Sequence, residues 1–109
     1  MHLLSRAEEI ILMAIVNLKE EAYGIAIKSY VSKATGFQWS IGAVYAPLHR
    51  LEEKGLVNTI KGEPVKERGG RSKVYYQVSP QGKQALLKLK DVNENIWRNV
   101  SAFEFEKVK

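Results

Sequence analysis

The chain has 109 residues, 45% of them hydrophobic, and a formal net charge of +5, which is typical of one soluble globular domain. It contains no cysteine, so disulfides, thiol catalysis and thiolate metal sites are excluded. The longest apolar run, residues 10–16, is far shorter than the ~20 residues that span a bilayer. We therefore expect a cytoplasmic protein that does not enter a membrane.

Two amphipathic helices are predicted in the first third of the chain. The first runs from about residue 5 to 18, with a serine as N-cap and Glu8-Glu9 near its positive end. The second runs from 23 to 36, where apolar residues recur at helical spacing. We interpret Glu8-Glu9, like the other adjacent glutamate pairs, as solvated surface. The link 37–39 is a candidate third strand of the sheet predicted below.

The central helix is predicted from Ser40, a good N-cap, to Lys54, which is followed by Gly55. Pro47 lies inside it and should bend the helix, because it leaves a carbonyl without its usual donor. The apolar stripe that should face the core recurs at spacings of three and four, and consists of Ile41, Val44, Leu48 and Leu51.

A β-hairpin is predicted next, from strands 56–60 and 74–78 and the polar loop 61–73 between them. The loop carries five basic and two acidic residues, a local net charge of +3. A basic projection of this kind indicates contact with phosphate. A helix followed by a hairpin with a basic tip is the layout of a winged helix, so we predict an α+β, mostly α, winged helix-turn-helix fold.

A last helix is predicted from Ser79 to about Glu104, because its apolar residues are spaced close to a heptad. One short domain has no further core for a helix of this length, so we expect the helix to pack against a second copy of the chain. This divides the chain into a winged-helix domain, 1–79, and a dimerisation helix, 80–109. The residues predicted to form the dimer are Leu89, Val92, Ile96 and Val100.

Catalytic and metal sites are not indicated. The only histidines are His2 and His49, and no nucleophile–base–acid set or metal-ligand cluster appears at useful spacing. The Gly69-Gly70 pair is not followed by a helix, so it favours a wing tip over a phosphate-binding loop. We expect a protein that is not an enzyme and holds no cofactor.

Double-stranded DNA is the partner that these elements fit best, because a helix fits the major groove and a wing lies along the backbone or in the minor groove. On the helix, Tyr45 offers a hydroxyl for phosphate and Arg50 suits guanine or phosphate. The wing cations strengthen binding without selecting sequence. The predicted DNA-binding residues are Ser40, Ala43, Tyr45, His49, Arg50, Lys66, Arg68, Arg71 and Lys73.

The sequence closely resembles the PadR family of bacterial transcriptional regulators over roughly residues 8–85. The resemblance lies in the tyrosine-glycine opening of the second helix at 23–24, the central-helix motif 40–52 with its following glycine-leucine, and the wing and helix entry from 70 to 82. Ala43 departs from the pattern, because the family usually has threonine there. We therefore expect Ala43 to lack the DNA contact that a threonine hydroxyl would make.

This resemblance implies a homodimeric repressor that binds a roughly palindromic operator. The single C-terminal helix looks like the short subfamily, in which that helix forms the dimer. Some relatives bind flat aromatic drugs between the subunits, next to a tryptophan of this helix. Trp97 stands in a comparable place, and Asn93 and Phe103 are expected to line the same space.

Two other functions remain open from the sequence. The first is a winged helix that binds protein, which predicts an exposed apolar patch on the central helix. The second is a small-molecule-binding dimer that lacks specific DNA binding, which predicts tight ligand binding with indifference to operator sequence.

Overall fold

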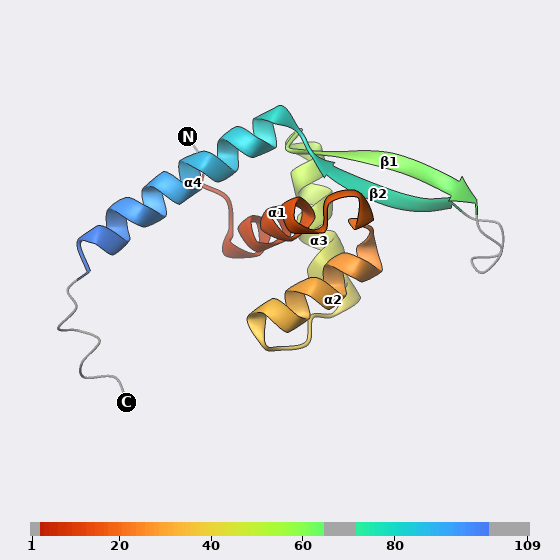
Figure 1. Cartoon of the computed structure of the whole chain (residues 1–109), viewed down its shortest axis with the longest axis horizontal. Helices are drawn as coiled ribbons and strands as arrows, with labels where there is room; N and C mark the ends of the chain where they lie inside the picture. The colour runs from red at the N-terminus through yellow and green to blue at the C-terminus, as the bar shows by residue number, and fades with distance from the viewer. Residues whose placement is uncertain (1–2, 65–71, 101–109) are drawn as a thin grey trace.

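The computed structural model describes residues 3–64 and 72–100. It confirms the predicted mostly helical α+β fold, in which the hairpin and the last helix extend in opposite directions from a helical core (Figure 1). No described helix is both long and apolar enough to cross a membrane. The elements in chain order are α1 (Arg6–Leu18), the 3-10 helix η1 (Lys19–Glu21), α2 (Gly24–Thr35), α3 (Ile41–Glu53), β1 (Val57–Pro64), β2 (Ser72–Val78) and α4 (Pro80–Arg98).

Helix boundaries follow the local signals in the sequence. Ser5 and Glu8 form a reciprocal capping box at the start of α1, which satisfies two amides that the helix itself leaves unpaired. Gly36 ends α2 with φ +81°, and Gly55 follows α3 with φ +74°. Both angles lie in the left-handed region that glycine adopts at no steric cost.

The sheet has two antiparallel strands in the described part of the chain, paired from Val57 opposite Val78 outward. The third strand predicted at 37–39 is wrong, because the additional bridge to β2 is made by Tyr23 opposite Tyr75. Trp39 is buried instead, and its indole nitrogen donates to the hydroxyl of Thr35 at 2.9 Å. The link between α2 and α3 is therefore held by side-chain packing.

The core lies where the first three helices meet the base of the hairpin. Its largest fully buried side chains are Ile11, Leu12, Ile27, Val31, Val44, Leu48, Leu51 and Val57. Ile41 was predicted to join them and does not, because it is 66% exposed in the first turn of α3. The inward stripe of α3 therefore begins one turn later, at Val44.

Helix α4 is anchored at its start and ends earlier than predicted. The Ser79 hydroxyl donates to the carbonyl of Gly55 at 2.7 Å and accepts from the amide of Gly82 at 3.0 Å. Leu89 is buried within the chain, at 8% exposure. The helix ends at Arg98 rather than near residue 104, and Figure 1 shows its second half extending beyond α1.

Candidate nucleic-acid interface

Helix α3 presents an exposed side opposite the side that it buries. Val44, Leu48 and Leu51 pack in the core, at exposures of 1% or less. The predicted DNA-binding residues of this helix and its cap are all exposed, namely Ser40, Ala43, Tyr45, His49 and Arg50. A helix that is anchored on one side and exposed on the other can enter a groove without loss of its core.

The first turn of α3 is apolar, and Gly42 gives it an open stretch of backbone. The Ser40 hydroxyl accepts from the amide of Ala43 at 3.0 Å, so this side chain caps the helix. A β-carbon added at Gly42 would meet no atom within 4 Å. The backbone of this turn is therefore open to close approach, and Ile41 is its largest exposed side chain.

Tyr45 of α3 and Lys73 of β2 line the same pocket, of about 160 Å³, at the start of α2. The Tyr45 hydroxyl lies against Gly24, which has no side chain to obstruct it. The Lys73 ammonium lies 4.2 Å from the centre of the Tyr23 ring, close enough for a cation–π contact. The fold thus brings one predicted contact of the helix together with one of the wing.

Arg50 lies on the exposed face of α3 as predicted, and it also makes an ion pair that was not predicted. Its Nε donates to Oε2 of Glu8 at 3.2 Å, and the Lys54 ammonium donates to the same oxygen at 2.8 Å. The Glu8 side chain is only 3% exposed, so its interpretation as solvated surface is wrong. Burial by itself would raise the pKa of Glu8, but the hydrogen bonds from Lys54, Ser5 and Arg50 and the charge of Lys54 lower it to about 2.

The second glutamate of the pair is also buried. Glu9 accepts from Arg6 at 3.1 Å and from the amide of Asn93 at 3.0 Å, and the residue is 9% exposed. The sequence carried one signal for Glu8, which lies three residues after the N-cap Ser5. It carried none for the links to α3 and α4, whose partners are distant in the chain.

The remaining predicted DNA contacts are less defined. His49 is exposed and lies 3.8 Å from the carboxylate of Glu53, one turn on. Lys66, Arg68 and Arg71 lie outside the described residues.

Two of the three residues predicted to bind a ligand lie at the junction of α1 and α4. Asn93 and Trp97 line a pocket of about 480 Å³, together with Glu9, Met13, Leu86, Leu87, Lys90 and Glu94. Phe103, which was predicted to join them, lies outside the described residues. Of the predicted dimer residues, Ile96 and Val100 are exposed at 60% and 38%, and Val92 is partly buried.

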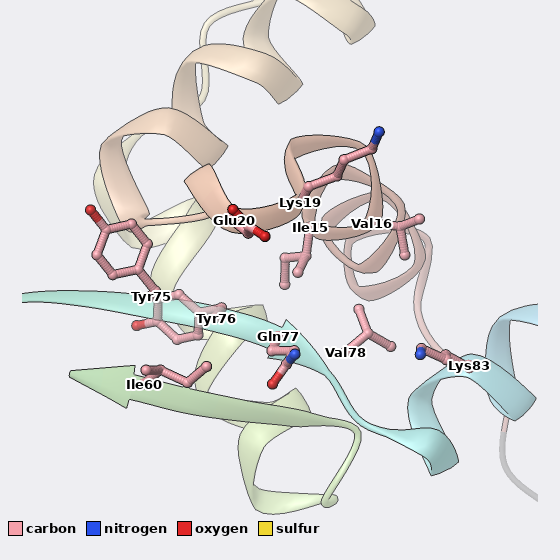
Figure 2. A pocket seen from close by; sticks show the side chains of 10 residues that line it. All are labelled: Ile15, Val16, Lys19, Glu20, Ile60, Tyr75, Tyr76, Gln77, Val78 and Lys83. Atoms are coloured by element: carbon pink, nitrogen blue, oxygen red, sulfur yellow. The ribbon is translucent and has the colours of Figure 1, made fainter. Parts of the chain in front are cut away.

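A third cavity, of about 530 Å³, was not predicted. It lies between the C-terminal end of α1 and the hairpin, with Ile15 and Val16 on one side and Ile60 and Tyr76 on the other (Figure 2). It includes none of the predicted DNA-binding or ligand-binding residues.

Comparison with known proteins supports the DNA-binding function. The model of the PadR-like family of transcriptional regulators matches residues 11–88. The chain belongs to this family. The predicted family and the predicted DNA-binding regulator are therefore confirmed, and the family consists of transcriptional regulators rather than enzymes.

Solved structures agree with this assignment. A PadR family transcription regulator from Clostridium difficile is 25% identical, with a TM-score of 0.60, and the match covers 84% of this chain and 86% of that one. RosR of H. salinarum is also 25% identical, with a TM-score of 0.63 and coverage of 96% and 86%. A PadR family regulator from Eggerthella lenta, at 18% identity, shares the fold, with a TM-score of 0.67 and coverage of 92% and 83%. None of the curated proteins compared with the PadR-like chain matches it.

Proposed function

We propose that this PadR-like regulator is a cytoplasmic homodimeric repressor that places α3 in the major groove of a roughly palindromic operator. The observation that carries the proposal is the pocket shared by Tyr45 of α3 and Lys73 of the wing. A tyrosine hydroxyl and a lysine ammonium are both donors to phosphate oxygens. One backbone phosphate at this pocket would contact the helix and the wing together.

The orientation of α3 follows from this contact. In helix-turn-helix proteins, the N-terminal residues of the recognition helix contact base edges. The start of α3 offers the open turn 41–43. The wing, 61–73, would then follow the backbone or enter the minor groove, with Lys66, Arg68, Arg71 and Lys73 acting through counterion release.

The homodimer is supported by the surface of α4. Leu87, Ile96 and Trp97 of this helix are each at least 60% exposed. Met13 and Val16 of α1 are also exposed. Exposed apolar side chains on these two neighbouring helices support an interface between copies of the chain. We therefore assign residues 80–109 to dimerisation and residues 1–79 to DNA binding. The predicted dimer residue Leu89 is buried within its own chain.

A direct test is binding to a duplex from the upstream region of the protein's own gene, compared with a scrambled duplex, across a salt series. We expect on the order of a thousandfold preference for the native duplex, with a steep salt dependence. Equal, weak and salt-sensitive binding to both duplexes would mean that the protein binds DNA only through its positive charge, without recognising sequence. Absence of binding would favour the protein-binding or ligand-binding function.

A ligand function is supported by the pocket of about 480 Å³ at Trp97, which lies within the usual size range of small-molecule sites. Its walls are mostly apolar, with the amide of Asn93 and the carboxylates of Glu9 and Glu94 among the polar groups. The carboxylate of Glu94 faces the Lys90 ammonium of the same pocket at 3.9 Å, and that of Glu9 accepts from Arg6. The apolar walls, rather than a net charge, therefore suit this pocket to a flat aromatic molecule. Planar dyes should quench Trp97 fluorescence in the wild type, and the quenching should be lost in Trp97→Phe, which retains the buried Trp39. Unchanged quenching in Trp97→Phe would exclude this site.

A further inference from the structure

Glu8 is a buried carboxylate that holds two cations of the DNA-reading helix. Its Oε1 accepts from the amide of Ser5 at 2.8 Å, and its Oε2 accepts from Arg50 and Lys54. Two positive charges against one negative charge leave this cluster with a net charge of +1. The contacts join the first turn of α1 to the C-terminal half of α3, which lies more than 40 residues later.

The bond to Arg50 uses one particular edge of its side chain. Nε of Arg50 donates to Oε2 of Glu8 at 3.2 Å, and the Arg50 side chain remains 47% exposed. A guanidinium is a rigid plane with five donors, so a bond at Nε fixes the plane and leaves the terminal nitrogens for another acceptor. A carboxylate on one edge therefore prepares the other edge for phosphate.

We propose that Glu8 is a positioning residue for DNA recognition, which orients Arg50 toward a backbone phosphate of the operator. This inference rests on the proposed function above. It assigns Arg50 to phosphate rather than to guanine, because Arg50 lies in the last turn of α3, away from the end that contacts bases. A correctly oriented phosphate contact sets the register of the helix on the duplex.

The decisive variant is Glu8→Gln, which retains an acceptor for Ser5 and removes the charge. Loss of a negative charge beside the DNA should maintain or raise affinity for a scrambled duplex. Loss of orientation should lower affinity for the native duplex by about tenfold, because charge-assisted bonds depend on geometry. The preference for the native duplex should therefore fall although the protein becomes more basic.

Several controls separate this role from a structural one. Glu21→Gln removes the same charge from an exposed site on η1 and should leave the preference unchanged. In an Arg50→Gln background, Glu8→Gln should have no further effect on the preference, because the two residues act as one unit. Thermal unfolding of each variant establishes the temperature at which all are folded, and binding is measured below it.

The outcomes are distinct. Equal gains in affinity for both duplexes would mean that Glu8 affects binding only through its negative charge. A lower melting temperature with an unchanged preference for the native duplex would mean that Glu8 only stabilises the fold. Either result overturns the inference. If Glu8→Gln does not fold, Arg50→Lys carries the test. It keeps the charge without the planar fork, and wild-type preference in this variant would overturn the inference. A wild type that does not distinguish the duplexes overturns the proposed function itself.

Discussion

The hydroxyl of Tyr45 lies in the space that a β-carbon of residue 24 would occupy. Glycine at this position lets the ring of Tyr45, from α3, lie across the start of α2, where Lys73 of the wing also lies. The tyrosine-glycine pair of the second helix thus has a physical reason, because the absent side chain makes room for a residue of the third.

Gly24→Ala should therefore displace Tyr45 and weaken DNA binding. The ring can rotate away, so we expect a cost near the lower end of overpacking, about 1 kcal/mol in the free energy of unfolding. Gly42→Ala is the matched control, because its added carbon meets nothing and alanine favours a helix by roughly 0.5–1 kcal/mol. Urea unfolding measures both. Equal stability changes would mean that Tyr45 does not occupy this space.

Gly82→Ala should be more damaging than Gly24→Ala. An added carbon would overlap the backbone carbonyl of Leu56, and a backbone group yields less easily than the end of a side chain. We expect a loss of about 3 kcal/mol, the upper part of the overpacking range. Urea unfolding of the two variants side by side measures the difference, and a smaller loss for Gly82→Ala than for Gly24→Ala would contradict the packing of α4 on this turn.

Glu8 should make the protein sensitive to acid. Its pKa is lowered in the folded state from 4.5 to about 2, so the folded protein binds this proton less readily than the unfolded chain. The stabilisation is fully present above pH ~4.5 and is lost as the pH falls toward 2. A shift of this size corresponds to about 3 kcal/mol.

Urea unfolding at several pH values measures this dependence. Glu8→Gln should be less stable than the wild type at neutral pH and should lose less stability on acidification. Glu21→Gln, at an exposed carboxylate, should follow the wild-type curve. A wild-type slope in Glu8→Gln would place the acid sensitivity elsewhere.

Ile41 should contact a thymine methyl group. It is 66% exposed at the start of α3, and apolar side chains at this place discriminate thymine through its methyl group. Replacement of operator thymines by deoxyuridine should weaken wild-type binding at one position per half-site, by about tenfold for each 1.4 kcal/mol lost. In Ile41→Ala the same replacement should have little effect. An equal loss in both proteins would remove Ile41 from base recognition.

Ile96→Glu should prevent dimerisation, because it places a charge on the exposed apolar side of α4. Light scattering should then give the mass of one chain, where the wild type gives two. Lys88→Glu, at an exposed polar position of the same helix, is the control and should remain dimeric. An unchanged mass for Ile96→Glu would exclude this face as the interface.

Local signals in the sequence were sufficient for most of the fold. Ser5, Gly36 and Gly55 act on neighbouring residues, so the helix ends at which they lie could be read from the chain itself. The predictions that were wrong concern how the elements pack against one another. The period of α3 placed Ile41 in its stripe, but the Ile41 side chain is 66% exposed.

The candidate site shows the same limit. The partners of Glu8 are 42 and 46 residues away, and nothing in the local pattern of Glu8-Glu9 indicates them. The heptad spacing of α4 is also ambiguous, because a seam that packs on its own chain has the same period as one that packs on a second copy. Leu89 packs on its own chain. Ile96 is exposed, as a residue that packs on a second copy would be.

The attachment of Ser79 gives α4 a further property. One hydroxyl joins Gly55, which follows α3, to the first turn of α4, and this contact orients α4 relative to α3. The 19 residues of α4 form a helix about 28 Å long, at ~1.5 Å per residue. In a dimer built on α4, the length of this helix would set the distance between the two copies of α3, and hence the number of base pairs between the operator half-sites.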